Sequence, residues 1–480
     1  MMINIRINEK NLEYDIYALA KAFYQNEEVN ITNTSETGED FSGFDVFYSE
    51  ENVSCSRIDN NVVSIHEFEE VKGLDKPASK NAMKRCIYRV FNGIKGEELP
   101  WGTLTGIRPT KLPMGMLYEG KTDEEITAYL KETYLVSDEK IRLSIDIARR
   151  EKTILDATDV NQYSLYVGIP FCPTTCLYCS FTSYPIARWM KRVDEYIDTL
   201  KKELNYVSDS FSDKKLTSVY IGGGTPTTLE ADQLRKLIGY MQKAFDFTTV
   251  KEFTVEAGRP DSITEDKLRA LKEMGVTRIS INPQTMNQDT LDIIGRRHTV
   301  EDIKNAFNMA RACGFDNINM DLILGLPGEG LEHVKNTMEE IKQLAPENIT
   351  IHSLAIKRAA KMAEYLREHE EIKSENNPQM LKTTEDAAAD MGLYPYYMYR
   401  QKNMAGNYEN VGYAMPGKEG IYNILIMEEV QTIIACGAGT VTKRVYGDGR
   451  IERCDNVKDV ALYISKIEEM IDRKRQLFAD

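Results

Sequence analysis

Three cysteines carry the most specific chemistry in this sequence of 480 residues. Cys172, Cys176 and Cys179 form a C-x3-C-x2-C run, and Tyr178 directly precedes the last of them. Thiolates spaced this closely can bind one face of an iron–sulfur cube. Three ligands leave one iron of a 4Fe-4S cluster without a protein ligand, as the open position does in a catalytic zinc site. The spacing therefore predicts a 4Fe-4S cluster with an iron that can bind a substrate.

A zinc site and metal-free thiols are the two alternatives for this motif. Structural zinc needs four ligands, but no histidine or fourth cysteine lies nearby, and the next thiol along the chain is Cys313. Three thiols without a metal would be stable in a reducing compartment. We expect the cysteines outside the motif to be small core or surface residues; they are Cys55, Cys86, Cys313, Cys436 and Cys454.

The histidines show no ligand spacing with one another. They are His66, His298, His333, His352 and His369. We expect His352 to lie in the core of the last predicted strand, and iron ligation is the alternative. The sequence contains no Ser/His/Asp grouping, Walker loop or zinc-deaminase signature.

A run of glycines, Gly222, Gly223 and Gly224, precedes Thr225 and ends an apolar segment. Residues without side chains let a ligand approach the backbone, and backbone amides and carbonyls can bind the charged ends of an amino acid. A tight turn between a strand and a helix is the alternative.

Polar residues also follow the next apolar segments, and they are Glu256, Gln284, Arg296 and Asp321. A carboxylate at a strand end can bind ribose hydroxyls or an ammonium group, and the guanidinium of Arg296 suits a carboxylate. Gly325–Glu329 is expected to shape a turn on which an adenine can stack. The alternatives are solvated residues, local salt bridges and a plain loop.

These residues require a scaffold that brings strand ends together. Six strand-length apolar runs alternate with amphipathic segments, and they are SLYVGIPF (164–171), SVYIGGG (218–224), EFTVEAG (252–258), RISINPQ (278–284), NINMDLILG (317–325) and NITIHSL (348–354). Alternating strands and helices predict a parallel sheet that curls into a full or partial TIM-like barrel. Such a barrel carries its chemistry at the carboxyl ends of the strands.

Three domains are expected in this α/β protein. The strand-like and helical patterns of residues 1–155 predict a small N-terminal α/β domain, with a helical pattern from Asp123 to Leu155. Residues 156–395 hold the barrel core. Residues 396–480 are short-stranded and glycine-rich, which indicates a C-terminal α+β cap.

Composition excludes several classes of protein. Hydrophobic residues make up 42% of the chain and charged residues 28%, as in ordinary globular proteins. The net charge of -15 argues against a general nucleic-acid binder. No apolar run long enough to span a membrane and no secretory signal is visible, so a cytoplasmic location is expected.

The motifs together resemble the radical S-adenosylmethionine (SAM) superfamily. The segments from Tyr166 to Cys172, GGGTPT, Gln284 to Arg296, Asp321 to Gly328 and Glu409 to Tyr413 are similar to the oxygen-independent coproporphyrinogen III dehydrogenase (oxidase) family. This resemblance covers about residues 160 to 445. The N-terminal part, with GIRPTK, resembles the branch of that family that carries an N-terminal extension.

The resemblance implies a partial barrel of six β/α units that cleaves SAM into methionine and a 5'-deoxyadenosyl radical. By motif position it implies SAM contacts at Tyr166, Gly223, Gly224, Thr225, Glu256, Gln284, Arg296, Asp321 and Ala355. Family members can hold a second SAM molecule. The implied electron donor is a protein such as flavodoxin or ferredoxin.

The implied substrate is a tetrapyrrole, coproporphyrinogen III, whose propionates become vinyl groups in protoporphyrinogen IX. Two positions depart from the family pattern: Gly168 stands where a histidine is common, and Phe181 stands where decarboxylating members have a fourth cysteine. Relatives that carry haem, or that methylate it, also lack that cysteine. A haem chaperone and a radical methyltransferase acting on haem therefore remain alternatives. The candidates for binding substrate carboxylates are Arg108, Lys111, Arg400 and Lys402.

Overall fold

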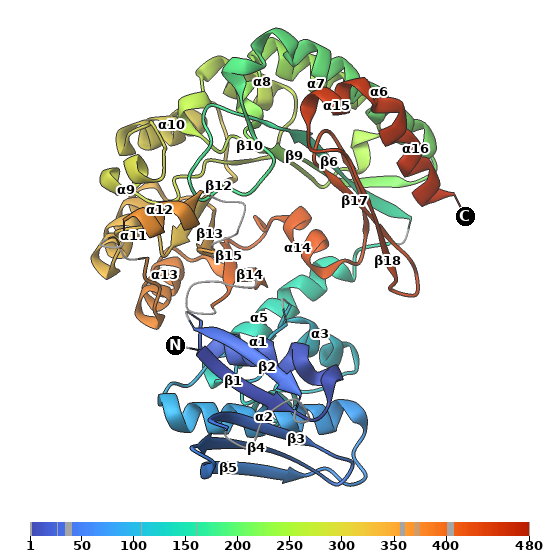
Figure 1. Ribbon diagram of the computed structural model, residues 1–480. Helices are drawn as coiled ribbons and strands as arrows, with labels where there is room; N and C mark the ends of the chain where they lie inside the picture. The colour runs from blue at the N-terminus through green and yellow to red at the C-terminus, as the bar shows by residue number, and fades with distance from the viewer. Residues whose placement is uncertain are drawn as a thin grey trace. The chain divides into compact units, whose positions relative to one another are not determined.

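The computed structural model describes residues 2–25, 27–33, 41–106, 108–159, 161–355, 361–369, 372, 374–400 and 408–479. The chain forms two compact units, Met1–Arg149 and Arg150–Asp480 (Figure 1). The domain boundaries expected after residues 155 and 395 stay predictions. No helix in the described parts of the chain is long and apolar enough to cross a membrane.

Unit 1 is built on a five-stranded sheet in the order β2-β1-β3-β4-β5. Its strands are β1 (Met2–Ile7), β2 (Glu28–Asn33), β3 (Gly43–Tyr48), β4 (Asn52–Asp59) and β5 (Val62–Glu70). Its helices are α1 (Glu13–Phe23), α2 (Lys76–Lys95), α3 (Lys111–Tyr118), α4 (Asp123–Tyr134) and α5 (Asp138–Leu155), the last of which runs on into unit 2. The core of unit 1 lies between the sheet and helices α1 and α2, where Ile5, Phe44, Ile87 and Phe91 are buried. The expected N-terminal α/β domain is confirmed as an α/β fold.

The helical pattern from Asp123 to Leu155 forms two helices and not one. Leu135 adopts a left-handed conformation at the end of α4, with a φ of 58°. A non-glycine residue in this region of φ ends a helix and redirects the chain. Helix α5 then begins at Asp138.

Unit 2 is built on an eleven-stranded sheet in the order β14-β15-β13-β12-β11-β10-β9-β6-β16-β17-β18. The six predicted runs form β6 (Gln162–Ile169), β9 (Lys215–Gly223), β10 (Glu252–Glu256), β11 (Arg278–Ser280), β12 (Ile318–Leu324) and β13 (Asn348–Ser353). Neighbours among these six strands are all parallel. The predicted parallel sheet is therefore confirmed. It is open, because β14 and β18 end the strand order in the described residues.

Helices follow the outer side of this curved sheet (Figure 1). They include α6 (Val193–Ser210), α7 (Ala231–Ala244), α8 (Glu265–Glu273), α9 (Gln288–Ile293), α10 (Val300–Ala312), α11 (Leu331–Leu344) and α13 (Pro378–Asp390). Helix α12 (Met362–Glu368) begins where the amide of Met362 donates to the carbonyl of Leu177. The arrangement is the partial barrel that alternating β and α segments predict.

The C-terminal segments extend the same sheet at both ends. Strands β14 (Tyr394–Tyr399) and β15 (Asn410–Ala414) continue it antiparallel beyond β13, and β16 (Thr432–Cys436) pairs parallel with β6. The remaining segments are β17 (Val441–Val445), β18 (Ile451–Asp455), α14 (Ile421–Glu428), α15 (Val460–Ser465) and α16 (Ile467–Phe478). The predicted α+β character of the tail is confirmed.

A buried ion pair fastens α16 to α6. Lys474 Nζ lies 2.6 Å from Glu203 Oε1, and both side chains are fully buried. Tyr463 Oη and the amide of Gly437 donate to Glu203 Oε2, and Asn456 Nδ2 donates to Oε1. A buried carboxylate with this many donors is fully compensated. The network therefore holds the tail against the end of β16.

Candidate active site

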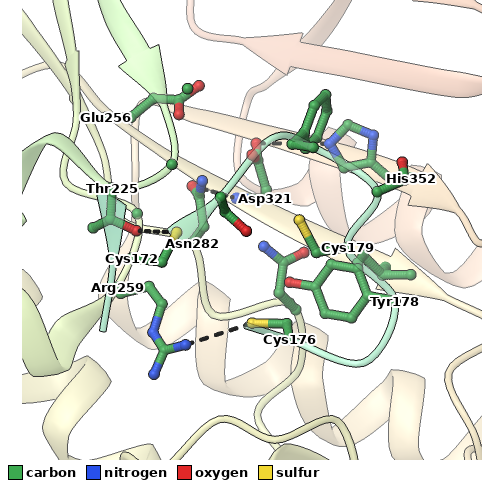
Figure 2. Close-up of a pocket in the computed structure, with 18 of the residues that line it drawn as sticks. Cys172, Cys176, Tyr178, Cys179, Thr225, Glu256, Arg259, Asn282, Asp321 and His352 are labelled. Carbon is green, nitrogen blue, oxygen red and sulfur yellow. Dashed lines mark hydrogen bonds and ion pairs between the residues drawn. The ribbon is translucent and has the colours of Figure 1, made fainter. Parts of the chain in front are cut away.

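The parallel strands surround one cavity of about 290 Å³ in unit 2 (Figure 2). All twelve site residues that the sequence predicts line it, and they are Tyr166, Cys172, Cys176, Cys179, Gly223, Gly224, Thr225, Glu256, Gln284, Arg296, Asp321 and Ala355. They come from strands β6, β9, β10 and β12 and from the segments that follow β6, β9, β11 and β13. Their roles in binding stay predictions, but their proximity is a fact of the fold.

The cysteine loop is fixed by backbone pairing on both sides. Two short strands, β7 (Phe171–Cys172) and β8 (Tyr184–Pro185), pair across the loop. The amide of Cys179 donates to the carbonyl of Cys176 at 3.2 Å, and the amide of Leu177 donates to the carbonyl of Ile294 at 3.0 Å. The loop therefore presents its three thiols from a defined backbone.

Each of two thiols receives a hydrogen bond from a neighbouring loop, as Figure 2 shows. Thr225 Oγ1 donates to Cys172 Sγ, and Arg259 Nη1 donates to Cys176 Sγ, both at 3.5 Å. Burial raises the pKa of the Cys172 thiol to about 11 and also raises that of Cys179. Buried thiols of this kind become thiolates when a metal supplies positive charge.

The three thiols fit an iron–sulfur cluster better than a single ion. Among the described residues, no three His, Cys, Asp or Glu side chains converge closely enough to hold one metal ion. A cube separates its three thiolates across different irons, whereas zinc draws four ligands around one centre. The zinc alternative therefore loses support, and the residues present fit the predicted 4Fe-4S cluster.

The end of β9 passes so close to β7 that side chains are excluded. A Cβ on Gly224 would lie 2.6 Å from the carbonyl oxygen of Phe171 and 3.0 Å from Cys172 Sγ. Gly223 has a φ of 109°, which favours glycine. The amides of Gly224 and Thr225 donate to the carbonyls of Ile169 and Phe171. These two amides are therefore already paired within the protein, and the binding of a ligand by the amides and carbonyls of this run stays a prediction.

Two carboxylates, one from β10 and one from β12 on the other side of β11, face the cavity in different electrostatic states. Burial raises the pKa of Glu256 to about 7, although Tyr220 Oη donates to its Oε1 at 2.6 Å. Burial also acts to raise the pKa of Asp321, but the nearby His352 side chain and a hydrogen bond from Asn319 outweigh it, so that this pKa is lowered. At neutral pH Asp321 is an anion, while Glu256 is close to its titration midpoint.

Gln284 reaches the cavity through a strained backbone. Its φ is 70°, which is uncommon for a residue with a side chain. Its amide donates to the carbonyl of Asp321 and its carbonyl accepts from Ile323, both at 2.9 Å. These two bonds attach the residue to β12 and hold it in the strained conformation. Strain of this kind is concentrated at functional sites.

Arg296 links the loop after β11 to the cysteine loop. It is buried, donates through Nη1 to the carbonyl of Asn282, and donates through Nη2 to Tyr178 Oη at 3.1 Å. Its Nε has no hydrogen-bond partner in the described part of the chain. Such a group is suited to an acceptor on a ligand.

Tyr166 lines the cavity and packs against two further aromatic rings. It stacks on Tyr220 and on Tyr422 of α14, with ring centroids 5.9 and 6.1 Å apart. Burial raises its pKa well above the ordinary value, so the phenol stays neutral. The stack places an uncharged surface beneath the polar strand ends.

Several lining residues were not predicted, and they are Tyr178, Ser180, Ser183, Gly258, Arg259, Asn282, Ile323, Ser353, Leu354, Tyr399 and Asn410. His352 was expected in the core of its strand. It does lie in β13, but its side chain is part-exposed and lines the cavity, with Nδ1 3.3 Å from Tyr399 Oη and Nε2 3.9 Å from Asp321 Oδ1. The missed signal was alternation, because His352 has the same strand parity as Thr350, which faces inward to Asn319.

The four predicted carboxylate-binding residues have different outcomes. Arg108 and Lys111 belong to unit 1, whereas the cavity belongs to unit 2. Arg400 follows Tyr399 at the end of β14 and is buried, and burial lowers its pKa to about 10. Lys402 lies outside the described residues. Binding of substrate by these residues stays a prediction.

The structure shows what surrounds Gly168 and Phe181, the two residues that depart from the family pattern. A Cβ on Gly168 would lie 2.5 Å from Thr440 Cγ2, so the loop between β16 and β17 fills the space of a side chain. Phe181 lines the cavity mouth and is 74% exposed. The position of the fourth cysteine is therefore accessible and apolar in this chain.

Comparison with known proteins gives a consistent result. The family description "Radical SAM superfamily" matches residues 166–341. The "Oxygen-independent coproporphyrinogen-III oxidase-like protein HemZ" of Bacillus subtilis is 39% identical over 401 residues, which cover 82% of this chain and 80% of that protein. The "Heme chaperone HemW" of Bacillus subtilis is 38% identical over 193 residues, which cover 40% of this chain and 50% of that protein.

A solved structure supports the fold. One match is the structure described as "Coproporphyrinogen III oxidase (HemN) from Escherichia coli is a Radical SAM enzyme". It has a TM-score of 0.52 and 22% sequence identity, and the match covers 66% of this chain and 72% of that one. At this identity the likeness concerns the fold alone. It agrees with the open parallel barrel of unit 2.

Proposed function

We propose that this chain, which belongs to the oxygen-independent coproporphyrinogen III oxidase-like proteins of the radical SAM superfamily, decarboxylates coproporphyrinogen III. The proposed products are protoporphyrinogen IX and carbon dioxide. The observation that carries the proposal is the single cavity in which three thiols, a glycine turn and the polar strand ends meet.

The proposed cofactors are a 4Fe-4S cluster on Cys172, Cys176 and Cys179 and SAM beside it. When bound, they supply a carbon radical that removes a hydrogen atom from an unactivated C–H bond. A second SAM stays a prediction, because a cavity of about 290 Å³ is at the small end of ligand sites. The cavity offers room on the scale of one nucleoside-sized ligand.

The side chains of the cavity divide the binding of SAM among charge, hydrogen bonding and stacking. The anionic Asp321 can accept hydrogen bonds from an ammonium group or from ribose hydroxyls, and Arg296 Nε can donate to a carboxylate. Glu256 can accept from a hydroxyl, or hold a proton, near neutral pH. The buried tyrosines beneath them exclude water from these contacts.

The substrate has to approach from the mouth, because the cavity itself is too small for a tetrapyrrole as well as SAM. Phe181 presents an exposed aromatic ring there, and such a ring can cover the apolar face of a macrocycle. His352 and Tyr399 line the same cavity with groups that can donate to a propionate. The proposed reaction removes one β-hydrogen atom per propionate, releases carbon dioxide, passes one electron to an acceptor and leaves a vinyl group.

A haem chaperone is the second candidate function. Two observations favour it: the 38% identity to a protein described as a heme chaperone, and Phe181 in place of a fourth thiol. A chaperone would keep the cluster but bind haem without converting it. Methylation of haem is a third outcome that the same experiment detects.

The deciding experiment is anaerobic turnover followed by mass spectrometry. The chain with its reconstituted cluster is incubated with SAM and dithionite, in parallel with coproporphyrinogen III and with haem. Stepwise loss of carbon dioxide from coproporphyrinogen III is expected. Methionine without a vinyl product contradicts decarboxylation. Stoichiometric haem binding without SAM turnover supports the chaperone, and S-adenosylhomocysteine with a methylated tetrapyrrole supports the methyltransferase.

A further inference from the structure

Arg259 is a buried cation that contacts the cysteine loop but belongs to a different part of the barrel. It lies three residues after β10 ends at Glu256, and only 3% of its surface is exposed. Its Nη1 lies 3.5 Å from Cys176 Sγ, which makes it a charged donor to one of the three thiols (Figure 2).

The direction of this donor is fixed by the rest of its hydrogen bonds. Nε and Nη2 of Arg259 donate to the two oxygens of Asp261 at 2.9 and 2.6 Å, and Nη1 donates to Thr174 Oγ1 at 2.8 Å and to the carbonyl of Thr174 at 3.2 Å. A bidentate pair fixes the plane of a guanidinium. Nη1, whose two hydrogens serve Thr174 and Cys176, is therefore held against the sulfur without freedom to turn away.

The three thiols receive different kinds of donor. Cys172 accepts from the neutral hydroxyl of Thr225. Cys179 accepts from the amide of Phe181 and the side chain of Ser183. Cys176, the most buried of the three, accepts from Arg259 and also lies beside Arg296. In the described residues, the donors to Cys176 are the ones that carry positive charge.

A cationic donor has a direct effect on the redox properties of a bound cluster. Hydrogen bonds to the cysteine sulfurs and the local charge set the reduction potential of an iron–sulfur centre. Reduction adds negative charge to the cluster and its thiolates, and a nearby cation in a buried site stabilises that charge. Removal of the cation makes the oxidised state relatively more stable.

We propose that Arg259 is a positioning residue that acts through Cys176 and raises the reduction potential of the cluster, so that a one-electron donor can reduce it. Asp261 and Thr174 aim the guanidinium at the sulfur. The inference rests on the proposed cluster and not on the identity of the tetrapyrrole.

The test is a redox titration of the full-length chain with its reconstituted cluster. Arg259→Met removes the charge and the donor while keeping much of the side-chain volume. Arg259→Lys keeps the charge but loses the fork, and Arg269→Met removes an exposed arginine of α8 as the matched control. Each variant is titrated anaerobically with dithionite, and the midpoint potential is followed by the electron paramagnetic resonance of the reduced cluster.

The midpoint potential of Arg259→Met is expected to shift to a more negative value than that of the unsubstituted chain. Arg259→Lys is expected to shift less, and Arg269→Met not at all. An Arg259→Met potential equal to that of the unsubstituted chain overturns the proposal, as does an equal shift in Arg269→Met. If Arg259→Met does not retain the cluster, Arg259→Gln takes its place and is judged by the same two outcomes.

The readout separates this inference from the proposed function. Potential and iron content are measured without a tetrapyrrole, so a shift in Arg259→Met stands even if coproporphyrinogen III is not converted. Conversely, vinyl products together with an unchanged potential leave the proposed function intact and remove the role of Arg259.

Discussion

The two faces of the parallel sheet in unit 2 differ in almost every strand. Val255 and Ile279 point to the outer face, where the helices lie, and both are fully buried. Their neighbours Glu256 and Ser280 point inward, because successive side chains alternate across a strand. Closed barrels fill this interior with branched apolar side chains. Here it holds carboxylates, tyrosines and an arginine, so the outer face specifies the fold and the inner face is reserved for ligands.

The difference implies opposite consequences for stability. Outer residues add apolar burial, whereas an inner carboxylate such as Glu256 is held in surroundings that disfavour its charge. Groups that destabilise the folded chain at neutral pH are typical of functional sites. Substitutions on the two faces should therefore separate stability from activity.

The largest expected effect is on the inner side, at the cysteine loop. Cys176→Ala removes one of three proposed cluster ligands, so iron binding and SAM cleavage should fall by more than the roughly 10- to 100-fold that loss of an outer-shell partner causes. Iron content and methionine release measure this. Cys313→Ala, outside the cavity, is the control. Retention of full iron content in Cys176→Ala would show that Cys176 is not a ligand of the cluster.

A large effect on stability is expected from the outer face. Ile279→Ala deletes a fully buried side chain between Arg278 and Ser280 and should cost about 2–5 kcal/mol of folding free energy. Denaturant unfolding followed by circular dichroism measures the loss. The folded fraction should keep its affinity for SAM. A loss of SAM affinity in folded Ile279→Ala would show that the two faces are not separable.

Glu256→Gln should change the pH dependence of stability in the ligand-free chain. The folded pKa is raised to about 7 from its ordinary value near 4.5, so the folded state binds the proton more tightly than the unfolded state. Stability from this group is therefore present below about pH 4.5, is lost as pH rises through about 7, and differs by about 3 kcal/mol across the window. A glutamine side chain does not titrate, so the variant does not lose this stability as the pH rises.

The stability of Glu256→Gln relative to the unsubstituted chain should accordingly increase from pH 5 to pH 8, as measured by unfolding at each pH. The titratable or charged groups around Glu256 include Tyr166, Tyr220, Tyr422, Asp321 and Arg278. SAM cleavage should fall in the variant at every pH. If the free energy of unfolding changes with pH equally in both proteins, the pKa of Glu256 is not raised in the folded chain.

The smallest effect is expected where the tail meets the inner face. Gly168→Ala places a Cβ against Thr440 Cγ2 and should cost about 1–3 kcal/mol. Thr440→Ser removes that methyl group but keeps the hydroxyl that donates to the carbonyl of Gly437. A double-mutant cycle on thermal unfolding should show rescue. Additive losses would mean that the methyl group is not the obstacle.

Sequence reasoning predicted the parts of this fold that depend on local pattern. The six strands and the positions of Glu256 and Asp321 followed from apolar runs that end in polar residues. Helix α2 was not predicted, although Asp75 at its start and Gly96 at its end are ordinary capping residues.

The remaining site residues depend on which loops meet in space. Arg259 looks in sequence like a solvated residue after a strand, and its contact with Cys176 arises only because the β10 loop packs against the cysteine loop. To predict that His352 lines the cavity, one would have to know which face of β13 its side chain points to and that Tyr399 approaches it from β14. Gly168 is explained by Thr440, more than 270 residues later in the chain.

The central claim is that the inner face holds a cluster that cleaves SAM. It is tested most directly by anaerobic reconstitution with iron and sulfide, followed by SAM and dithionite, with chromatography of the nucleoside product. The unsubstituted chain should release 5'-deoxyadenosine and methionine, and Cys176→Ala should release neither. A folded, cluster-loaded chain that binds SAM but leaves it intact, or equal product from Cys176→Ala, would contradict the account.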